Sequence, residues 1–341
     1  MRIDTHLGDL SGAAERAVAL EQAGFDGLMS VETQHDPFLP LVVAAEHTRR
    51  VDLITGIAVA FARNPMTLAH VGHDLQEYSK GRFILGLGSQ IRPHIEKRFS
   101  MTWSHPAPRM RELISAVRTI WEAWDTGSKL DFRGDFYTHT LMTPFFNPGP
   151  NPHGNPRIFV AAVGQAMTEA AAEVADGIIL HAFTNERYLR DVTLPAVERG
   201  LARSGRRRED FEISLPCFVI TGEEQADVDA LRSAVRAQIA FYGSTPAYRP
   251  ALEVHGWGDL QGELNTLSKQ GRWADMAELI DGSVLDAFAV QGTPDDIPER
   301  LLARFGDIVD RLSFYAFPGG GAGGWARIVD GLRRGTAGSR T

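Results

Sequence analysis

The feature of this sequence that most restricts its fold is the alternation of short apolar, β-branched runs with amphipathic stretches. The eight strand-like runs are Ile3–Leu7, Gly27–Val31, Leu53–Phe61, Phe83–Gly88, Ile158–Val163, Gly177–His181, Glu212–Ile220 and Arg311–Phe317. The helical patterns between them include Gly12–Ala23, Pro65–Tyr78, Arg109–Trp124, Met167–Ala175, Tyr188–Ser204, Asp227–Phe241 and Pro298–Phe305. Such alternation indicates a parallel sheet covered by helices. Eight units favour an α/β fold of the (β/α)8 TIM-barrel type over a doubly wound sheet.

The length of 341 residues suits one barrel, so we expect a single domain over residues 1–341. Two long segments interrupt the alternation, residues 126–156 and residues 243–292. The first contains KLDFRGDFYTHT, which predicts a β-hairpin, and the second predicts short helices over Asp259–Gln270 and Trp273–Asp281. Insertions on the C-terminal face of a barrel cap the active site, and we expect these two to shape it.

Composition excludes several classes of function. The only cysteine is Cys217, which excludes a disulfide framework and a cysteine-based zinc site. The net charge is −8 without a basic cluster, so nucleic acid is not the expected partner. The sequence has no run of about 18 apolar residues and no basic start followed by an apolar stretch, so we expect neither a membrane span nor a secretory signal. A cytoplasmic enzyme acting on small molecules is expected.

Polar side chains follow several of the predicted strands. Glu32 and His35 come after the second run, Ser89 after the fourth, and His181 and Thr184 after the sixth. Carboxyl ends of barrel strands converge on one mouth, where catalysis takes place. Each residue alone is more often a solvated loop residue or a helix cap. Their occurrence after three strands favours a site, with Glu32, His35 and then His181 as candidates for proton transfer.

The fifth unit, RIFVAAVGQAMTEAAAEVADG, combines a strand, a turn of small residues at Ala161–Gly164 and a helix. Small residues allow a ligand to approach the backbone, and a helix start offers free N–H groups to a phosphate. The sequence has neither a Walker motif nor a Gly-x-Gly-x-x-Gly motif, so the signal is weak. Close packing of the strand on the helix explains the small residues equally well.

Three further features have plain structural explanations. His70 and His73 lie three residues apart on a predicted helix, where packing is expected rather than metal binding, and we predict no metal site. Trp121 and Trp124 are expected to pack a helix on the barrel. The run Gly319–Gly321 follows the last strand and is read either as a flexible lid or as an ordinary loop.

Longer blocks carry a resemblance to a known family. They are ETQHDPFLPLVVAAEHTRRVDLITGIAVAFARNPMTLA, YSKGRFILGLGSQIRPHIEKRFSMTWSHPAPRMRE, VAAVGQ with ADGIILHAFTNERYL, and FAVQGTPDDIPERL. Together these blocks resemble the luciferase-like monooxygenase superfamily, in particular its actinobacterial branch of coenzyme F420-dependent oxidoreductases. The resemblance extends over about the whole chain. GRFILGLGSQ and ADGI occur across the superfamily and do not separate flavin users from deazaflavin users.

The resemblance implies a barrel closed around an isoalloxazine-type ring, that of coenzyme F420 or alternatively that of FMN. It implies a cis peptide bond between Gly56 and Ile57 that forms a bulge behind the ring. The cofactor-binding residues that it implies are Gly56, Ile57, Ala58, Gly88, Ser89, Gln90, Ala162, Val163, Gly164, His181 and Thr184. A homodimer is expected as well.

The chain departs from the sugar-phosphate dehydrogenases of this superfamily. These enzymes have an Asp-His pair after the second strand, where this chain has Thr33-Gln34. Where they have a glutamate after the fourth strand, this chain has Ile91, and their phosphate-binding lysine falls near Thr184. Oxidation of glucose 6-phosphate is therefore disfavoured.

Three functions remain open on the sequence. The first is hydride transfer between a small organic substrate and F420, with Glu32 or His35 moving the proton. The second is an FMN-dependent, two-component monooxygenase in which reduced flavin captures O₂. The third is a non-catalytic flavin-binding relative, which the small residues at the phosphate turn and the polar strand ends disfavour. Fold alone does not choose among them.

Overall fold

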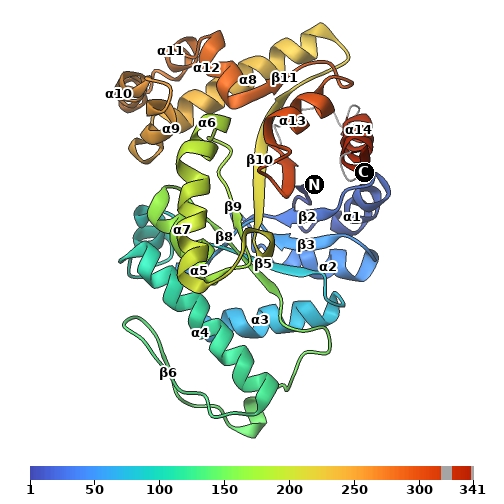
Figure 1. Ribbon diagram of the computed structural model, residues 1–341, viewed down its shortest axis with the longest axis vertical. Coiled ribbons are helices and arrows are strands. Elements are labelled where there is room, and N and C mark those ends of the chain that lie inside the picture. Colours follow the sequence, from blue (N-terminus) through green and yellow to red (C-terminus); the bar gives the residue numbers. More distant parts are fainter. Residues whose placement is uncertain (316–324, 339–341) are drawn as a thin grey trace.

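The computed structural model describes residues 1–315 and 325–338 and has eight parallel strands at its centre (Figure 1). These strands are β1 (Arg2–His6), β2 (Gly27–Ser30), β3 (Asp52–Thr55), β5 (Phe83–Gly88), β8 (Arg157–Ala161), β9 (Gly177–Ile179), β10 (Glu212–Ile220) and β12 (Arg311–Phe314). Each pairs in parallel with the next, and β12 pairs with β1, which closes the sheet. The predicted (β/α)8 barrel is confirmed. The run Gly319–Gly321 lies outside the described residues.

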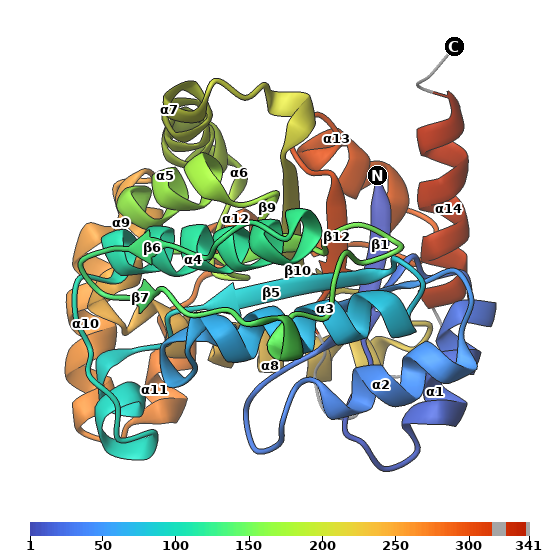
Figure 2. The ribbon, with the colours of Figure 1, turned by 90° about the horizontal axis from the view of Figure 1, so that it is seen from below.

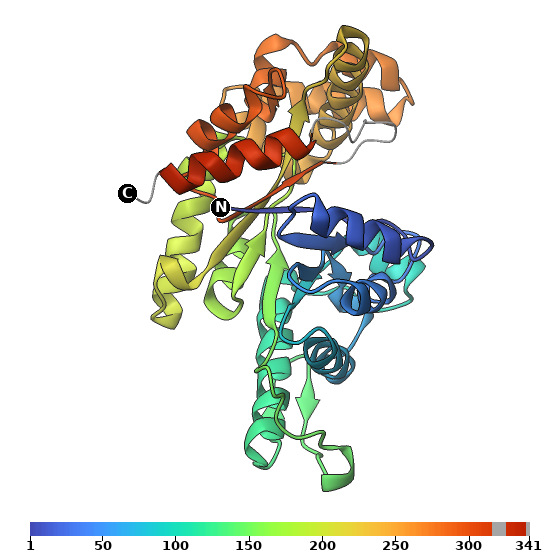
Figure 3. The same ribbon diagram turned by 90° about the vertical axis from the view of Figure 1, so that its right-hand side faces the viewer.

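Helices cover the outside of this barrel (Figures 1 and 3). They are α1 (Ala13–Gln22), α2 (Leu39–His47), α3 (Pro65–Tyr78), α4 (Pro106–Thr126), α5 (Gln165–Val174), α6 (Glu186–Tyr188), α7 (Leu194–Ser204), α8 (Gln225–Gly243), α13 (Ile297–Phe305) and α14 (Trp325–Gly338). Helix α2 was not among the predicted helices. Its sequence, LPLVVAAEH, has apolar residues on all sides, so that Leu39 and Val42 are exposed while Leu41 is buried, and no amphipathic period marks it.

The third strand of the barrel is interrupted. The predicted run Leu53–Phe61 forms β3 and a short continuation, β4 (Ala58–Val59), which pairs with the end of β5. Between them, the peptide bond from Gly56 to Ile57 is cis, as the family resemblance implies. The Thr55 hydroxyl donates to the carbonyl of Gly86 and accepts from its N–H, both at 2.8 Å, which ties the bulge to β5.

Residues 126–156 form the predicted hairpin, with β6 (Phe132–Arg133) antiparallel to β7 (Thr138–His139). It begins where α4 ends and folds back along this helix (Figure 2). The Glu112 carboxylate of α4 accepts the backbone N–H groups of residues 135–137 at its tip, at 2.9, 2.7 and 2.6 Å. The hairpin therefore packs on a helix of the outer layer.

Residues 243–292 form a helical unit. It consists of α9 (Arg249–Glu253), α10 (Gly258–Lys269), α11 (Trp273–Glu278), α12 (Gly282–Phe288) and β11 (Ala289–Gln291), which pairs with the end of β10. Its apolar cluster includes Leu264 and Phe288, together with Phe183 and Phe218 from the ends of β9 and β10. The unit therefore sits on the C-terminal ends of these strands.

The opposite end of the barrel is filled by paired charges. The Arg311 guanidinium is fully buried and binds both carboxylate oxygens of Asp4, at 2.7 and 2.8 Å. It also donates to Asp52 at 2.8 Å and to Glu212 at 3.3 Å, and Arg157 bridges these last two carboxylates. Burial alone would lower the pKa of Arg311, but the attraction of the three carboxylates has the larger effect and raises this pKa.

Candidate active site

The interior of the barrel has an apolar floor below the strand ends. Met29, Ile54, Ile84, Phe159 and Ile179 come from five different strands and form one buried cluster. The partly buried Ile57 and Ala161 pack against it and so continue it toward the C-terminal strand ends. Such a floor provides a flat apolar surface without hydrogen-bonding groups of its own, which suits one face of an aromatic ring.

Glu32 is bound to the bulge between β3 and β4. One carboxylate oxygen accepts the backbone N–H of Val59 and the guanidinium of Arg63, each at 2.6 Å, and only 7% of the side chain is exposed. The Glu32 backbone N–H donates to the carbonyl of Ile57 at 3.2 Å. A carboxylate held by both a guanidinium and a backbone N–H is fixed in place, which suits a role in positioning the bulge.

His35 is exposed, and in the described part of the chain no residue forms a hydrogen bond with its ring. The cap of α2 comes from Asp36 instead, whose Oδ1 accepts the N–H of Phe38 at 2.8 Å and that of Leu39 at 3.4 Å. His35 is therefore free to meet a ligand, and its role as the proton-transferring group stays a prediction.

His181 lies two residues beyond Ile179, the inward-facing residue at the end of β9. Its Nδ1 accepts the backbone N–H of Phe183 at 3.0 Å. The ring stacks on Tyr248 with centroids 4.7 Å apart and meets Tyr242 edge-on at 4.5 Å. Burial lowers the pKa of His181 to about 4, so the imidazole is neutral near pH 7.

Thr184 has a buried hydroxyl without a partner among the described residues. The next residue, Asn185, has partners for both atoms of its amide: the nitrogen donates to the carbonyl of Ala251 at 2.8 Å, and the oxygen accepts the N–H of Tyr188 at 2.9 Å. Buried polar atoms without a partner are uncommon in native proteins and point to a missing ligand or water. Thr184 thus fits a ligand-binding role that its sequence position alone predicts weakly.

The predicted phosphate turn has the backbone such a site needs. Gly164 has a φ of +77° and ψ of 160°, a conformation that only glycine adopts readily, and nothing lies within 4 Å of the place where its Cβ would stand. Val163 is 43% exposed. No side chain caps the start of α5, so the N–H groups of its first turn have no partner within the helix and are available to an anion.

The other predicted cofactor residues differ in accessibility. Gly88 is buried, and a Cβ on it would come within 2.8 Å of Ile57, so a larger residue would crowd the bulge. Ser89 and Gln90 are half-buried. Ala58 and Ala162 belong to the core between barrel and helices, so they support the site through the backbone and do not offer side chains to it.

Sequence reasoning missed four residues near the strand ends. His6 ends β1 two residues beyond the inward-facing Asp4, and burial lowers its pKa. Because alternate residues of a strand face the same side of the sheet, the position of His6 two residues after Asp4 could have predicted that its side chain faces the barrel interior. Tyr242, Tyr248 and Tyr315 surround the His181 side of the mouth, and the hydroxyls of Tyr242 and Tyr315 are 2.8 Å apart. No sequence pattern predicts a contact between His181 and residues about sixty positions away.

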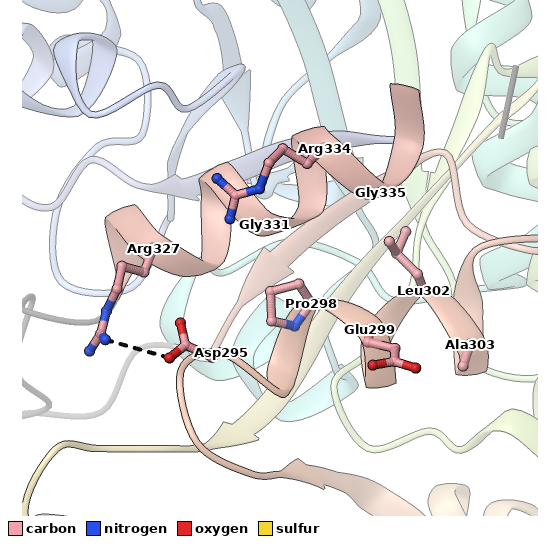
Figure 4. Close-up of a pocket in the computed structure, with 9 residues that line it drawn as sticks. All are labelled: Asp295, Pro298, Glu299, Leu302, Ala303, Arg327, Gly331, Arg334 and Gly335. Atoms are coloured by element: carbon pink, nitrogen blue, oxygen red, sulfur yellow. Dashed lines mark ion pairs between the residues drawn. The ribbon is translucent and has the colours of Figure 1, made fainter. Parts of the chain in front are cut away.

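Features away from the mouth have structural roles. The rings of His70 and His73 pack on Trp124, and across the described residues no group of three or more His, Cys, Asp or Glu side chains could hold a metal ion. Figure 4 shows a cleft between α13 and α14 on the outer surface, where Pro298 lies against Gly331. None of the helices in the described ranges is long and apolar enough to cross a membrane.

Comparisons with known proteins show the family of the chain. The chain is 60% identical over 303 residues to an uncharacterized protein of Mycobacterium tuberculosis, covering 89% of each chain. It is 29% identical over 312 residues to an F420-dependent glucose-6-phosphate dehydrogenase of Intrasporangium calvum, covering 84% of this chain and 83% of the relative. Its fold resembles that of the coenzyme F420-dependent tetrahydromethanopterin reductase from Methanopyrus kandleri, with a TM-score of 0.77, 18% identity and coverage of 97% and 96%. The family model of the luciferase-like monooxygenases matches residues 2–311, and the chain belongs to this family.

Proposed function

We propose that this protein is an F420-dependent oxidoreductase that transfers a hydride between the deazaflavin and a small organic substrate. The observation that carries the proposal is the combination, at one end of the barrel, of an apolar floor with an uncapped helix start. The first suits a tricyclic ring and the second suits the phosphate of its side chain. A sequence relative named as F420-dependent supports the choice of the deazaflavin as the first cofactor to test.

The residues present fit such a cofactor. The ring would lie on the floor near Ile57 and Ala161, with Gly88 leaving room for the bulge beside it. The phosphate would bind the N–H groups that follow Gly164, and the partnerless Thr184 hydroxyl is a further donor for the tail. When bound, F420 supplies the carbon that accepts or releases the hydride.

The protein's own groups have separate tasks in this proposal. Glu32 fixes the bulge through Val59 and Arg63, so its task in this proposal is to position the ring. His35 is exposed after β2 and is our first candidate for moving the substrate proton. Neutral His181 offers a hydrogen bond to the substrate without changing its charge. The substrate is expected to be a small organic molecule other than glucose 6-phosphate.

Titration of the purified apoprotein with F420 and, separately, with FMN tests this proposal. Quenching of cofactor and protein fluorescence gives a dissociation constant for each. We expect micromolar binding of F420 and binding of FMN at least tenfold weaker, about 1.4 kcal/mol. Tight binding of FMN alone would instead favour the flavin-dependent monooxygenase, and binding of neither would exclude both cofactors.

A further inference from the structure

The hydrogen bond from the Phe183 N–H fixes the tautomer of His181. Nδ1 accepts this bond at 3.0 Å, so in the neutral ring the hydrogen resides on Nε2. Among the described residues, none forms a hydrogen bond with Nε2. The Nε2 edge of the imidazole is therefore a hydrogen-bond donor that can bind an acceptor.

The inserted helical unit holds this ring in place. Tyr248 stacks on it at an interplanar angle of 24°, and Tyr242 approaches it at 79°. Both tyrosines also contact Phe183, which stacks on Phe288 at 4.4 Å. Tyr242 in turn shares a 2.8 Å hydrogen bond with Tyr315. His181 is therefore fixed by residues from the loop after β9, from α8 and from the turn before α9.

The groups around His181 are uncharged. Burial is the cause of its lowered pKa, with no charge contributing. Burial likewise raises the pKa of Tyr242 and of Tyr248, and the hydrogen bond with Tyr315 raises that of Tyr242 further, so both phenols stay protonated. An anion placed here would lose hydration without gaining a cation, whereas an uncharged acceptor would lose little.

We propose that His181 is the substrate-binding donor of this enzyme, that Tyr242 and Tyr248 are its positioning residues, and that the substrate is uncharged and presents a carbonyl or hydroxyl oxygen to Nε2. This inference rests on the proposed function and specifies its substrate class. It also separates His181 from the cofactor phosphate, which the family resemblance had placed beside it. The phosphate belongs at the start of α5 and at Thr184.

Nitrogen-15 NMR of the apoprotein labelled at histidine tests the state of the ring, with His181→Asn used to assign the signal. We expect the Nε2–H tautomer at every pH above about 5.5, because a pKa near 4 leaves the ring neutral there. In Tyr248→Ala, water reaches one face of the ring and the pKa should rise by about one unit or more toward its ordinary value. Tyr248→Phe keeps the stacked ring and should leave the signal unchanged.

If Tyr248→Ala does not fold, Tyr248→Thr loses less volume, still admits water to one face of the imidazole, and serves the same comparison. A wild-type His181 that titrates near pH 6.5, or one with its hydrogen on Nδ1, would overturn the proposal. So would an equal pKa of His181 in the wild type and in the alanine or threonine variant. None of these readings depends on F420, so failure of the proposed function would be recognised separately in the cofactor titration.

The substrate class is tested on the same signal with two probes. Cyclohexanone, an uncharged carbonyl compound, should shift the Nε2 resonance of His181 in the wild type and in Tyr248→Phe, and much less in Tyr248→Ala. Inorganic phosphate should leave this resonance unchanged and perturb the backbone amides after Gly164. A shift of His181 with phosphate, or no shift with cyclohexanone, would overturn the assignment.

Discussion

The polar groups at the two ends of the barrel differ in whether they have partners within the protein. At the N-terminal end, Arg311 is bound by Asp4, Asp52 and Glu212 in a closed network of charges. At the mouth, the Thr184 hydroxyl and the Nε2–H of His181 have no partner among the described residues, and the start of α5 is uncapped. Both ends belong to the same barrel.

This difference implies that the polar groups at the N-terminal end stabilise the fold, whereas those at the mouth bind a ligand. Removing one member of a saturated buried network leaves its partners charged and unsolvated, so the fold loses free energy. A polar group that lacks a partner in the free protein costs stability already, and a ligand that supplies the partner recovers this free energy on binding. Substitutions at the first end should therefore change unfolding, and substitutions at the second should change ligand affinity.

Arg311→Met should have the largest effect. It leaves Asp4 and Asp52 without their buried cation, and we expect the free energy of unfolding to fall by about 3–5 kcal/mol in urea denaturation. Arg2→Met is the matched control, since Arg2 also binds Asp52 but is 51% exposed, so its loss should cost less than about 1 kcal/mol. Equal losses in the two variants would remove the distinction between a buried network and a surface pair.

Substituting valine for each of two buried threonines distinguishes a hydroxyl that stabilises the fold from one that binds a ligand. Thr55→Val removes a hydroxyl that makes two hydrogen bonds with Gly86, and should destabilise the fold by about 1–3 kcal/mol. Thr184→Val removes a hydroxyl with no partner, so stability should stay the same or rise, while F420 binds several-fold more weakly. Urea denaturation and fluorescence titration measure both quantities. A large destabilisation in Thr184→Val would mean that its hydroxyl is already satisfied within the protein.

A charge at the phosphate turn should weaken binding. Gly164→Asp and Gly164→Ala impose the same backbone strain at a φ of +77°, so their difference isolates the carboxylate. We expect the Asp variant to bind F420 at least tenfold more weakly than the Ala variant, about 1.4 kcal/mol. Equal affinities would move the phosphate away from the start of α5.

Glu32→Gln should have the smallest effect. It removes the charge of the pair with Arg63 but keeps an oxygen that can accept the Val59 N–H, so we expect roughly a fivefold loss of F420 affinity, about 1 kcal/mol. The pH profile of turnover with the natural substrate should keep its shape, because Glu32 positions the bulge. If one limb of the pH profile were lost in Glu32→Gln, Glu32 would be the group that transfers the proton.

The alternation of apolar runs with amphipathic stretches predicted most of the fold. The eight apolar runs correspond to the eight barrel strands because burial on both faces leaves a signal in the residues themselves. Helix α2 was missed because Leu39 and Val42 stay exposed on an apolar helix. The break between β3 and β4 followed from the resemblance at Gly56-Ile57 and not from any local pattern.

The site was less predictable, because long-range contacts determine it. The position of Glu32 after a strand was visible, but its bond to Arg63, 31 residues away, was not. For His181 the sequence indicated a polar strand end, while its neutral state depends on Tyr242 of α8 and Tyr248 of the inserted unit. Roles that depend on burial and on partners distant in sequence require the folded chain.

A crystal structure of the complex with F420 tests the central claim most directly. The account predicts the deazaflavin ring over Ile57 and Ala161 at the C-terminal strand ends, with the phosphate on the N–H groups after Gly164 and its oxygen near Thr184. A cofactor bound in the outer cleft between α13 and α14, or one inverted so that its phosphate contacts His181, would contradict it.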